Sequence, residues 1–194
     1  INTSVLTSWE GINQFTNEKQ SLTLPTMKIG DKPILVNKDI KVPSPIVDEV
    51  KKLQDVTCTI FQKINDAGDM LRVCTNVQTK NGERAIGTYI PAKEPDGTPN
   101  AVVKAVLNGE RYKGRAFVVD RWYVTAYDPM YDNKGKIVGM LYTGIPQESA
   151  SALRKAIMDI VIGKTGYVFI FNGKGVNRGY AVVTYKGTLD GLNE

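Results

Sequence analysis

The stretch at residues 82–147, GERAIGTYIPAKEPDGTPNAVVKAVLNGERYKGRAFVVDRWYVTAYDPMYDNKGKIVGMLYTGIPQ, decides the fold. Prolines and a glycine within residues 91–99 predict a loop, which leads into a short helix over residues 100–107. Residues 112–127 are rich in aromatic and β-branched side chains, and we interpret them as one long strand. A turn at residues 132–135 then returns the chain as another strand. The stretch therefore predicts a sheet with one loop-helix insertion.

The flanking segments add helices and hairpins to this sheet. Apolar residues recur about every 3.6 positions in residues 1–15, which predicts an amphipathic helix at the N-terminus. Residues 56–64 and 70–77 are β-rich, and the turn residues between them predict a hairpin. An apolar stripe predicts a helix over residues 149–162, and a second hairpin follows it. Helices packed on an antiparallel sheet place the chain in the α+β class.

The composition of the 194-residue chain is that of an ordinary globular domain, with 42% hydrophobic and 23% charged residues. The net charge is +5, but the basic residues alternate with acidic ones along the chain. We therefore expect a solvated surface of mixed charge and no binding of nucleic acid. Histidine is absent, which removes the commonest general base, a common metal ligand and the CxxCH motif that attaches haem. No carboxylate pair forms a recognisable motif either, so we expect no catalysis, no cofactor and no metal site.

Cys58 and Cys74 lie on the two strands of the first predicted hairpin. If they oppose each other directly, the turn is centred at Asp66 and their Cα atoms come within bridging range. We therefore predict a disulfide, which would indicate an oxidising, extracytoplasmic location. The alternative is a pair of reduced, buried thiols in a cytosolic protein, and a register change of one residue would separate them onto opposite faces.

Arginines and tyrosines gather on the strands around the loop-helix insertion, where a half-buried pocket would need them. A small carboxylate requires paired guanidinium donors, hydroxyl donors and an apolar wall for its alkyl end. Strand alternation assigns Arg115, Arg121, Tyr123 and Tyr127 to one face and Trp122 to the other, without telling which face lines a pocket. Taken singly, each residue has the alternative of a surface arginine or a packing tyrosine. The candidate ligand-binding residues are Arg72, Tyr89, Arg115, Arg121, Trp122, Tyr123 and Tyr127.

Five segments within residues 57–194 carry a family resemblance: RVCTNVQTKNGERAIGTYIP, DGTPNAVVKAVLNGERYKGRAFVVDRWYVTAYDPMYD, GKIVGMLYTGIPQE, IVIGKTGYVFIFNGKG and RGYAVVTYKGTLDG. In this order they resemble the Cache 3/Cache 2 fusion family of extracytoplasmic sensor domains, found on bacterial methyl-accepting chemotaxis receptors and some histidine kinases. The resemblance implies a PAS-like antiparallel sheet with a ligand pocket under the insertion at residues 91–107. It also implies a homodimer, and it assigns residues 1–15 to a long helix that follows a membrane span.

Under this resemblance, residues 1–194 are a single sensor domain with three segments. They are an N-terminal helical and extended segment at 1–56, the pocket-bearing sheet at 57–147, and a helix plus hairpin at 148–194. The last segment stops before the family's usual final part, and Ile1 in place of Met predicts a fragment whose membrane anchor lies outside it. A haem sensor is disfavoured, because haem-carrying relatives need a motif that this chain lacks.

We therefore expect the periplasmic ligand-binding domain of an inner-membrane chemotaxis receptor. Its expected ligand is a short organic carboxylate such as acetate. One alternative is the sensor domain of a histidine kinase that binds an amino acid or an amine. The other is a non-catalytic extracellular structural module.

Overall fold

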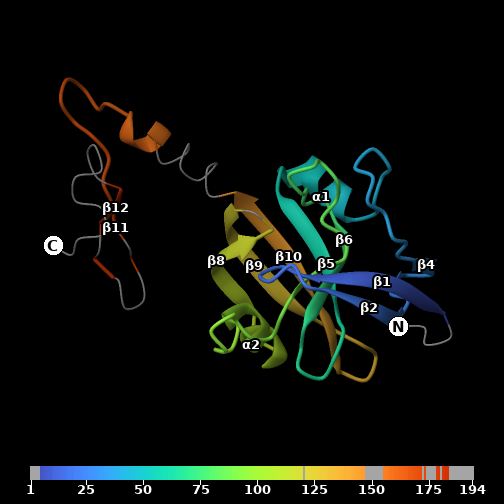
Figure 1. Cartoon of the computed structure of the whole chain (residues 1–194). Coiled ribbons are helices and arrows are strands. Elements are labelled where there is room, and N and C mark those ends of the chain that lie inside the picture. The colour runs from blue at the N-terminus through green and yellow to red at the C-terminus, as the bar shows by residue number, and fades with distance from the viewer. Residues whose placement is uncertain are drawn as a thin grey trace. The chain divides into compact units, whose positions relative to one another are not determined.

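A mixed sheet of eight strands forms the centre of the first part of the chain (Figure 1). The strands are β1 (Leu6–Asn13), β2 (Lys19–Pro25), β5 (Thr57–Lys63), β6 (Met70–Thr75), β7 (Thr88–Ile90), β8 (Tyr112–Val118), β9 (Arg121–Tyr131) and β10 (Ile137–Pro146). Their order in the sheet is β2-β1-β7-β6-β5-β10-β9-β8. The α+β class is confirmed, but the sheet is mixed rather than antiparallel, because β1 pairs with β7 in parallel.

The structure is a computed structural model that describes residues 5–119, 121–146, 155–171, 173, 178–179 and 181–183. The chain divides into two compact units, Ile1–Ile145 and Pro146–Glu194. The single sensor domain expected from the sequence, with its three segments at residues 1–56, 57–147 and 148–194, stays a prediction. Over the described ranges, no helix has the length and the apolar character that a membrane span requires.

The N-terminal segment predicted as a helix over residues 1–15 forms strand β1 instead. β1 pairs with β2 from Leu6 to Ile12, and Trp9 of β1 and Leu24 of β2 enter the same core. A short isolated helix is marginal in water, whereas a hairpin satisfies the backbone of both segments at once. The prediction of a long N-terminal helix is therefore wrong for the described residues, which begin at Val5.

Two short helices pack on opposite faces of the sheet. Helix α1 (Val47–Gln54) contacts β5 and β6 and buries Val47 in one core. Helix α2 (Ala101–Leu107) lies beside β8 and β9 (Figure 1) and buries Val103 in the other core. Alternation along β5 separates these cores, because Ile60 lies on the α1 face and Phe61 on the α2 face. The predicted helix of the insertion is confirmed, with the Asn100 side chain accepting the first-turn N–H of Val103.

The aromatic segment 112–127, predicted as one strand, is a hairpin of β8 and β9. The chain reverses at Val119, whose φ of 61° is a conformation that β-branched residues rarely adopt. Neither Gly nor Asn stands at this position, so the usual sign of a tight reversal is missing here. The reversal puts Ala116 opposite Tyr123, and Arg115 therefore lies on the other face of the sheet from Tyr123. The predicted sharing of one face by these two residues is wrong.

Cys58 and Cys74 are both buried and free, and they do not oppose each other in the hairpin. Cys74 lies opposite Ile60, because the register shifts after Ile60 and leaves Val73 without a partner in the ladder. The Cys58 carbonyl instead accepts the backbone N–H of Asn76 at 3.1 Å. The predicted opposition is therefore wrong: the register next to the turn, with Lys63 opposite Met70, would set Cys58 opposite Thr75, and the β-bulge shifts it by one further residue. Burial raises the pKa of both thiols to about 11, so both are protonated at neutral pH.

The guanidinium of Arg84 is fully buried, and each of its nitrogens is hydrogen-bonded. Nη1 donates to Asp48 Oδ1 at 2.8 Å and to the Thr75 carbonyl at 2.9 Å. Nη2 donates to Asp48 Oδ2 at 2.7 Å and to the Val42 carbonyl at 2.9 Å, and Nε donates to the Asp39 carbonyl at 3.2 Å. A bidentate partner and saturated donors make a buried charge tolerable here. The network ties the loop before α1 to the sheet.

In the second unit, β11 (Ile170–Phe171) pairs antiparallel with β12 (Ala181–Val183), in agreement with the hairpin predicted for this region. Residues 155–158 are helical and lie inside the helix predicted over residues 149–162, whose beginning lies outside the described residues. In the first unit, β3 (Lys28–Ile29) and β4 (Lys32–Pro33) form a further short antiparallel pair.

We expect Asp48→Asn to destabilise the first unit by about 2–3 kcal/mol at neutral pH, because Arg84 loses its charge partner. Burial of Asp48 opposes its ionisation, but hydrogen bonds from Arg84 and from the Ser44 N–H hold its pKa below the ordinary value of 3.8. A depressed carboxyl pKa contributes stability above the unfolded-state pKa, and this stability is lost as the pH falls through the folded-state pKa. Urea unfolding should therefore show a difference between variant and wild type that is constant above about pH 5 and shrinks below pH 3.8.

The exposed Asp66 in the turn between β5 and β6 provides the matched control. Asp66→Asn should change the unfolding free energy little at any pH. A stability difference for Asp48→Asn that stays constant down to about pH 2 would contradict the contribution of the Asp48–Arg84 pair.

Candidate functional site

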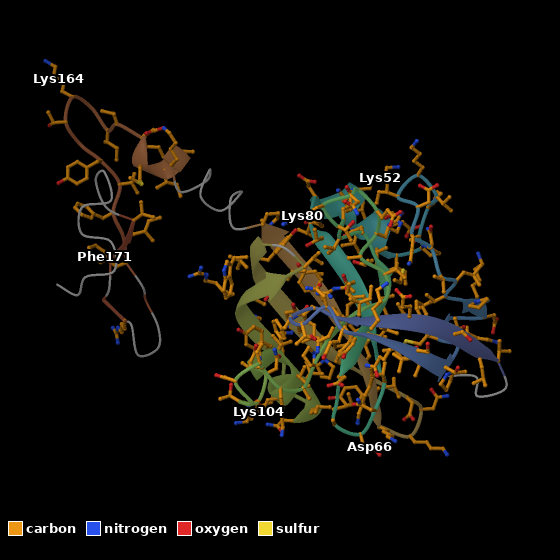
Figure 2. The ribbon with its side chains drawn as sticks, in the orientation of Figure 1. Lys52, Asp66, Lys80, Lys104, Lys164 and Phe171 are labelled. Atoms are coloured by element: carbon orange, nitrogen blue, oxygen red, sulfur yellow. The ribbon has the colours of Figure 1, made fainter. Side chains whose placement is uncertain are left out.

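A cavity of about 320 Å³ lies between the beginning of α2 and the sheet. In Figure 2, Lys104 marks the exposed side of α2, whereas Val102 and Val103 are buried on the side of the sheet. The turn after β1, the loop before α2, and the strands β8 and β9 complete the wall. The lining residues are Gln14, Phe15, Ile90, Glu94, Asn100, Ala101, Val102, Tyr112, Arg115, Ala116, Trp122 and Tyr127. The cavity thus lies under the loop-helix insertion, where the family resemblance implies a ligand pocket.

The guanidinium of Arg72 on β6 is completely buried next to two residues of the cavity wall, Gln14 and Tyr127. Its Nη1 donates to Thr88 Oγ1 at 2.7 Å, and its Nη2 donates to Gln14 Oε1 at 3.1 Å. Its Cζ lies 5.0 Å from the centre of the Phe61 ring. Both acceptors are neutral, and among the described residues no carboxylate pairs with Arg72. The positive charge is therefore held without being neutralised.

Two polar atoms of this cluster lack a hydrogen-bond partner among the described residues, Nε of Arg72 and the hydroxyl of Tyr127. Tyr127 is fully buried, and its ring centre lies 5.0 Å from that of Tyr142 and 6.3 Å from that of Phe61. Each buried unsatisfied donor costs on the order of 1–3 kcal/mol. Both groups are donors, so an acceptor is the kind of group that each of them lacks.

The charge states of these groups follow from burial. Burial lowers the pKa of Arg72, and the neighbouring Tyr127 and Tyr142 act in the opposite direction. Burial likewise raises the pKa of Tyr127 and of Tyr142. An arginine starts so far above neutrality that it stays a cation. At neutral pH the cluster therefore combines a cation with phenols that remain protonated and able to donate.

Arg72 and Arg84 solve the same physical problem in different ways. Arg84 has a bidentate carboxylate and three backbone carbonyls at hydrogen-bonding distances of 3.2 Å or less. Arg72 has one hydroxyl, one amide oxygen and an aromatic ring. Burying an unpaired ion costs several kcal/mol. The charge and donors of Arg84 are thus satisfied by its neighbours, whereas Nε of Arg72 lacks a partner among the described residues.

The structure brings three of the predicted ligand-binding residues together on the α2 face. Tyr123 and Tyr127 of β9 belong to the core beneath α2, and Arg72 interacts electrostatically with both. Figure 2 shows the side chains that fill the space between the sheet and α2. The face that lines the cavity, which alternation alone did not determine, is therefore the face of Tyr127.

The other predicted residues lie elsewhere or at the rim. Tyr89 of β7 packs in the core on the α1 face, away from the cavity. The guanidinium of Arg115 lies 5.2 Å from the Trp122 ring centre, and both side chains are exposed at the rim of the cavity. The side chain of Arg121 lies outside the described part of the chain.

Sequence reasoning missed Gln14 and Thr88, the two acceptors that hold Arg72. Gln14 belongs to the segment that the apolar spacing assigns to a helix, and Thr88 is an ordinary residue for a strand. Their contacts with Arg72 join positions 58 and 16 residues apart. No local pattern in the sequence could have indicated them.

The wall chemistry offers little to a metal ion. Among the described residues, no group of three His, Cys, Asp or Glu side chains is arranged to hold one. Glu94 is the one carboxylate among the lining residues, and its Oε1 accepts a hydrogen bond from Asn100 Nδ2. The cavity wall therefore carries the hydroxyl of Tyr127, which lies next to the buried Arg72, and the carboxylate of Glu94.

A family model for the Cache 3/Cache 2 fusion domain matches residues 1–193. The match includes residues 1–56, beyond the segments that carry the resemblance in the sequence. Domains of this family are extracytoplasmic sensors of small molecules and are generally not catalytic. No curated protein and no solved structure matched the chain.

We expect Tyr127→Phe to leave the unfolding free energy unchanged or to raise it by up to about 1 kcal/mol, because the deleted hydroxyl has no partner. Tyr142→Phe is the matched control, since its hydroxyl lies 2.9 Å from Thr57 Oγ1. Loss of that hydrogen bond should cost about 1 kcal/mol. Urea unfolding of the two variants measures the contrast. Equal destabilisation by both substitutions would show that the Tyr127 hydroxyl is already satisfied.

Proposed function

Since the chain belongs to the Cache 3/Cache 2 fusion family, we propose that its cavity beneath α2 binds a small organic anion, most simply a short monocarboxylate such as acetate. The observation that carries this proposal is the buried guanidinium of Arg72, which has only neutral acceptors and one unsatisfied nitrogen. A ligand carboxylate would supply the missing counter-charge. The family supplies the wider setting of an extracytoplasmic sensor.

The proposed contacts follow from the donors that the cluster leaves open. One carboxylate oxygen would accept from Nε of Arg72, and the other would accept from the Tyr127 hydroxyl. The side chains of Phe15, Ile90 and Val102 would cover the alkyl end. In this arrangement the guanidinium provides the affinity for the carboxylate group, and the apolar wall limits the size of the alkyl part of the ligand.

We further propose that the domain belongs to a periplasmic receptor for chemotaxis and works as a homodimer. Signalling requires that the ligand bind one arrangement of the receptor more tightly than the other, since equal affinity shifts no equilibrium. A histidine kinase could carry the same sensor domain. The buried arginine supports the ligand class and does not discriminate between these two outputs.

Glu94 favours a second candidate, an amino acid or an amine. Its carboxylate lines the same cavity and could bind an ammonium group, while Arg72 binds a carboxylate. A zwitterion would satisfy both ends, whereas a simple amine would leave Arg72 unpaired. The anion therefore remains the first candidate, and the ligand screen below separates the two.

We expect acetate to raise the melting temperature of the wild-type domain in a concentration-dependent way, because it binds only the folded state. Arg72→Met should weaken this binding by at least roughly a hundred-fold, since charge-assisted hydrogen bonds are lost. Its own unfolding free energy should stay within about 1 kcal/mol of wild type, because an unpaired buried charge is replaced by an apolar side chain. Thermal shift and calorimetry with acetate, glycine and ethylamine measure these effects.

Arg111→Met is the control, because Arg111 forms an exposed ion pair with Asp128 and lies outside the cavity. It should bind acetate like the wild type. Stabilisation by ethylamine but not by acetate would overturn the anion assignment, and stabilisation by glycine alone would favour the amino acid. No stabilisation by any small molecule would favour the structural module.

A further inference from the structure

Gln14 stands between the cavity and Arg72. It follows the last residue of β1, its side-chain oxygen accepts from Arg72 Nη2 at 3.1 Å, and it lines the cavity. Of the described residues on the cavity wall, Gln14 and Tyr127 are the neighbours of Arg72, and Arg72 itself is not part of the wall. An anion in the cavity therefore reaches the guanidinium past one of these two side chains.

The two neighbours differ in how they engage the charge. The Tyr127 hydroxyl has no hydrogen-bond partner among the described residues, so it does not occupy a guanidinium donor. The Gln14 amide does occupy one, and Gln14 is half-buried at the start of a turn rather than fixed inside a strand. Nε and Nη2 share one edge of the planar guanidinium, so a carboxylate oxygen that accepts from the free Nε comes within reach of Nη2 and competes there with the Gln14 oxygen.

We propose that Gln14 is the gate of the site: a neutral acceptor that holds Arg72 until an anion displaces it, and whose neutrality makes the site selective for anions. This inference rests on the proposed function and specifies how the same site chooses its ligand. An amide oxygen competes weakly for a guanidinium, whereas a carboxylate competes strongly because it neutralises the charge. A glutamate at this position would be a permanent internal ligand.

Displacement of the Gln14 side chain would also affect the backbone hydrogen bonds of the β1–β2 hairpin. The backbone N–H of Gln14 donates to the Tyr89 carbonyl at 3.1 Å, and the next N–H, that of Phe15, donates to Asn13 Oδ1 at 2.9 Å. β1 joins β7 through only two residue pairs, Ile12 with Thr88 and Asn13 with Tyr89. The gate therefore lies on the short connection between the hairpin and the rest of the sheet, and its movement would loosen the hydrogen bonds of the turn.

Two substitutions at one position test the gate, with acetate as the probe and calorimetry as the measurement. Gln14→Glu should abolish acetate binding and raise the melting temperature of the domain without acetate, because it closes the ion pair internally. Gln14→Ala should bind acetate roughly ten-fold more tightly, because the competing hydrogen bond to a charged group is gone. Hydrogen exchange gives an independent readout: acetate should speed exchange of the Gln14 and Phe15 amides in the wild type and leave them unchanged in Gln14→Ala.

Each result separates the gate from the proposed function. Failure of the wild type to bind acetate, glycine or ethylamine would overturn the proposed function itself. If the wild type binds acetate and Gln14→Glu binds it equally well, the role of Gln14 as a gate is overturned and the proposed function stands. Acetate binding that is weakened ten-fold or more in Gln14→Ala would also overturn it, since Gln14 would then be a direct ligand contact. A rise in melting temperature for Gln14→Glu together with lost binding supports the gate.

Discussion

Strand β6 is buried on both faces along its whole length, and this constraint decides what a charged residue on it can do. An arginine in such a strand cannot reach water, so its charge must find acceptors inside the protein. Arg72 finds two neutral side chains and an aromatic ring. Arg84 lies outside β6 but donates to the carbonyl of Thr75, the last residue of this strand. It also donates to the carboxylate of Asp48 and to further backbone carbonyls. The same fold thus buries the guanidinium of Arg84 with all its nitrogens hydrogen-bonded, and buries the guanidinium of Arg72 with Nε left without a partner among the described residues.

The incomplete satisfaction of Arg72 has an energetic meaning. Two unit charges about 4 Å apart attract by about 4 kcal/mol at an effective dielectric of 20, against about 1 kcal/mol in water. An anion beside Arg72 would therefore gain more than the same anion beside a surface arginine such as Arg111. Thr88 makes this possible without neutralising the charge, because its hydroxyl accepts from Arg72 and donates to the Ala85 carbonyl, which fixes the guanidinium in place. A carboxylate in the position of Thr88 would give a more stable protein with a weaker site.

Local patterns in the sequence predicted the elements whose partners are close in the chain. The hairpin of β5 and β6 and the helix that begins at Asn100 follow from turn and capping residues that act within a few positions. The strand β1 and the reversal at Val119 could not be predicted in this way. In the first case a hairpin partner overrides a helical spacing, and in the second the turn lacks its usual residues. The site was predictable only in part for the same reason: Arg72 and Tyr127 are conspicuous residue types, whereas Gln14 matters only through a contact made by the folded chain.

The position of the charge depends on a turn rather than on the arginine alone. The turn at residues 65–69 sets Lys63 opposite Met70, and two residues further along the register sets Phe61 opposite Arg72, on the α2 face. The bulge at Val73 then shifts the register, so that Cys74 falls in the core on the α1 face. Because side chains alternate between faces, lengthening the turn by one residue would turn β6 over and move the guanidinium into that core. The aromatic and amide neighbours of Arg72 lie on the α2 face, so the turn sequence fixes the location of the site as firmly as the residues that form it.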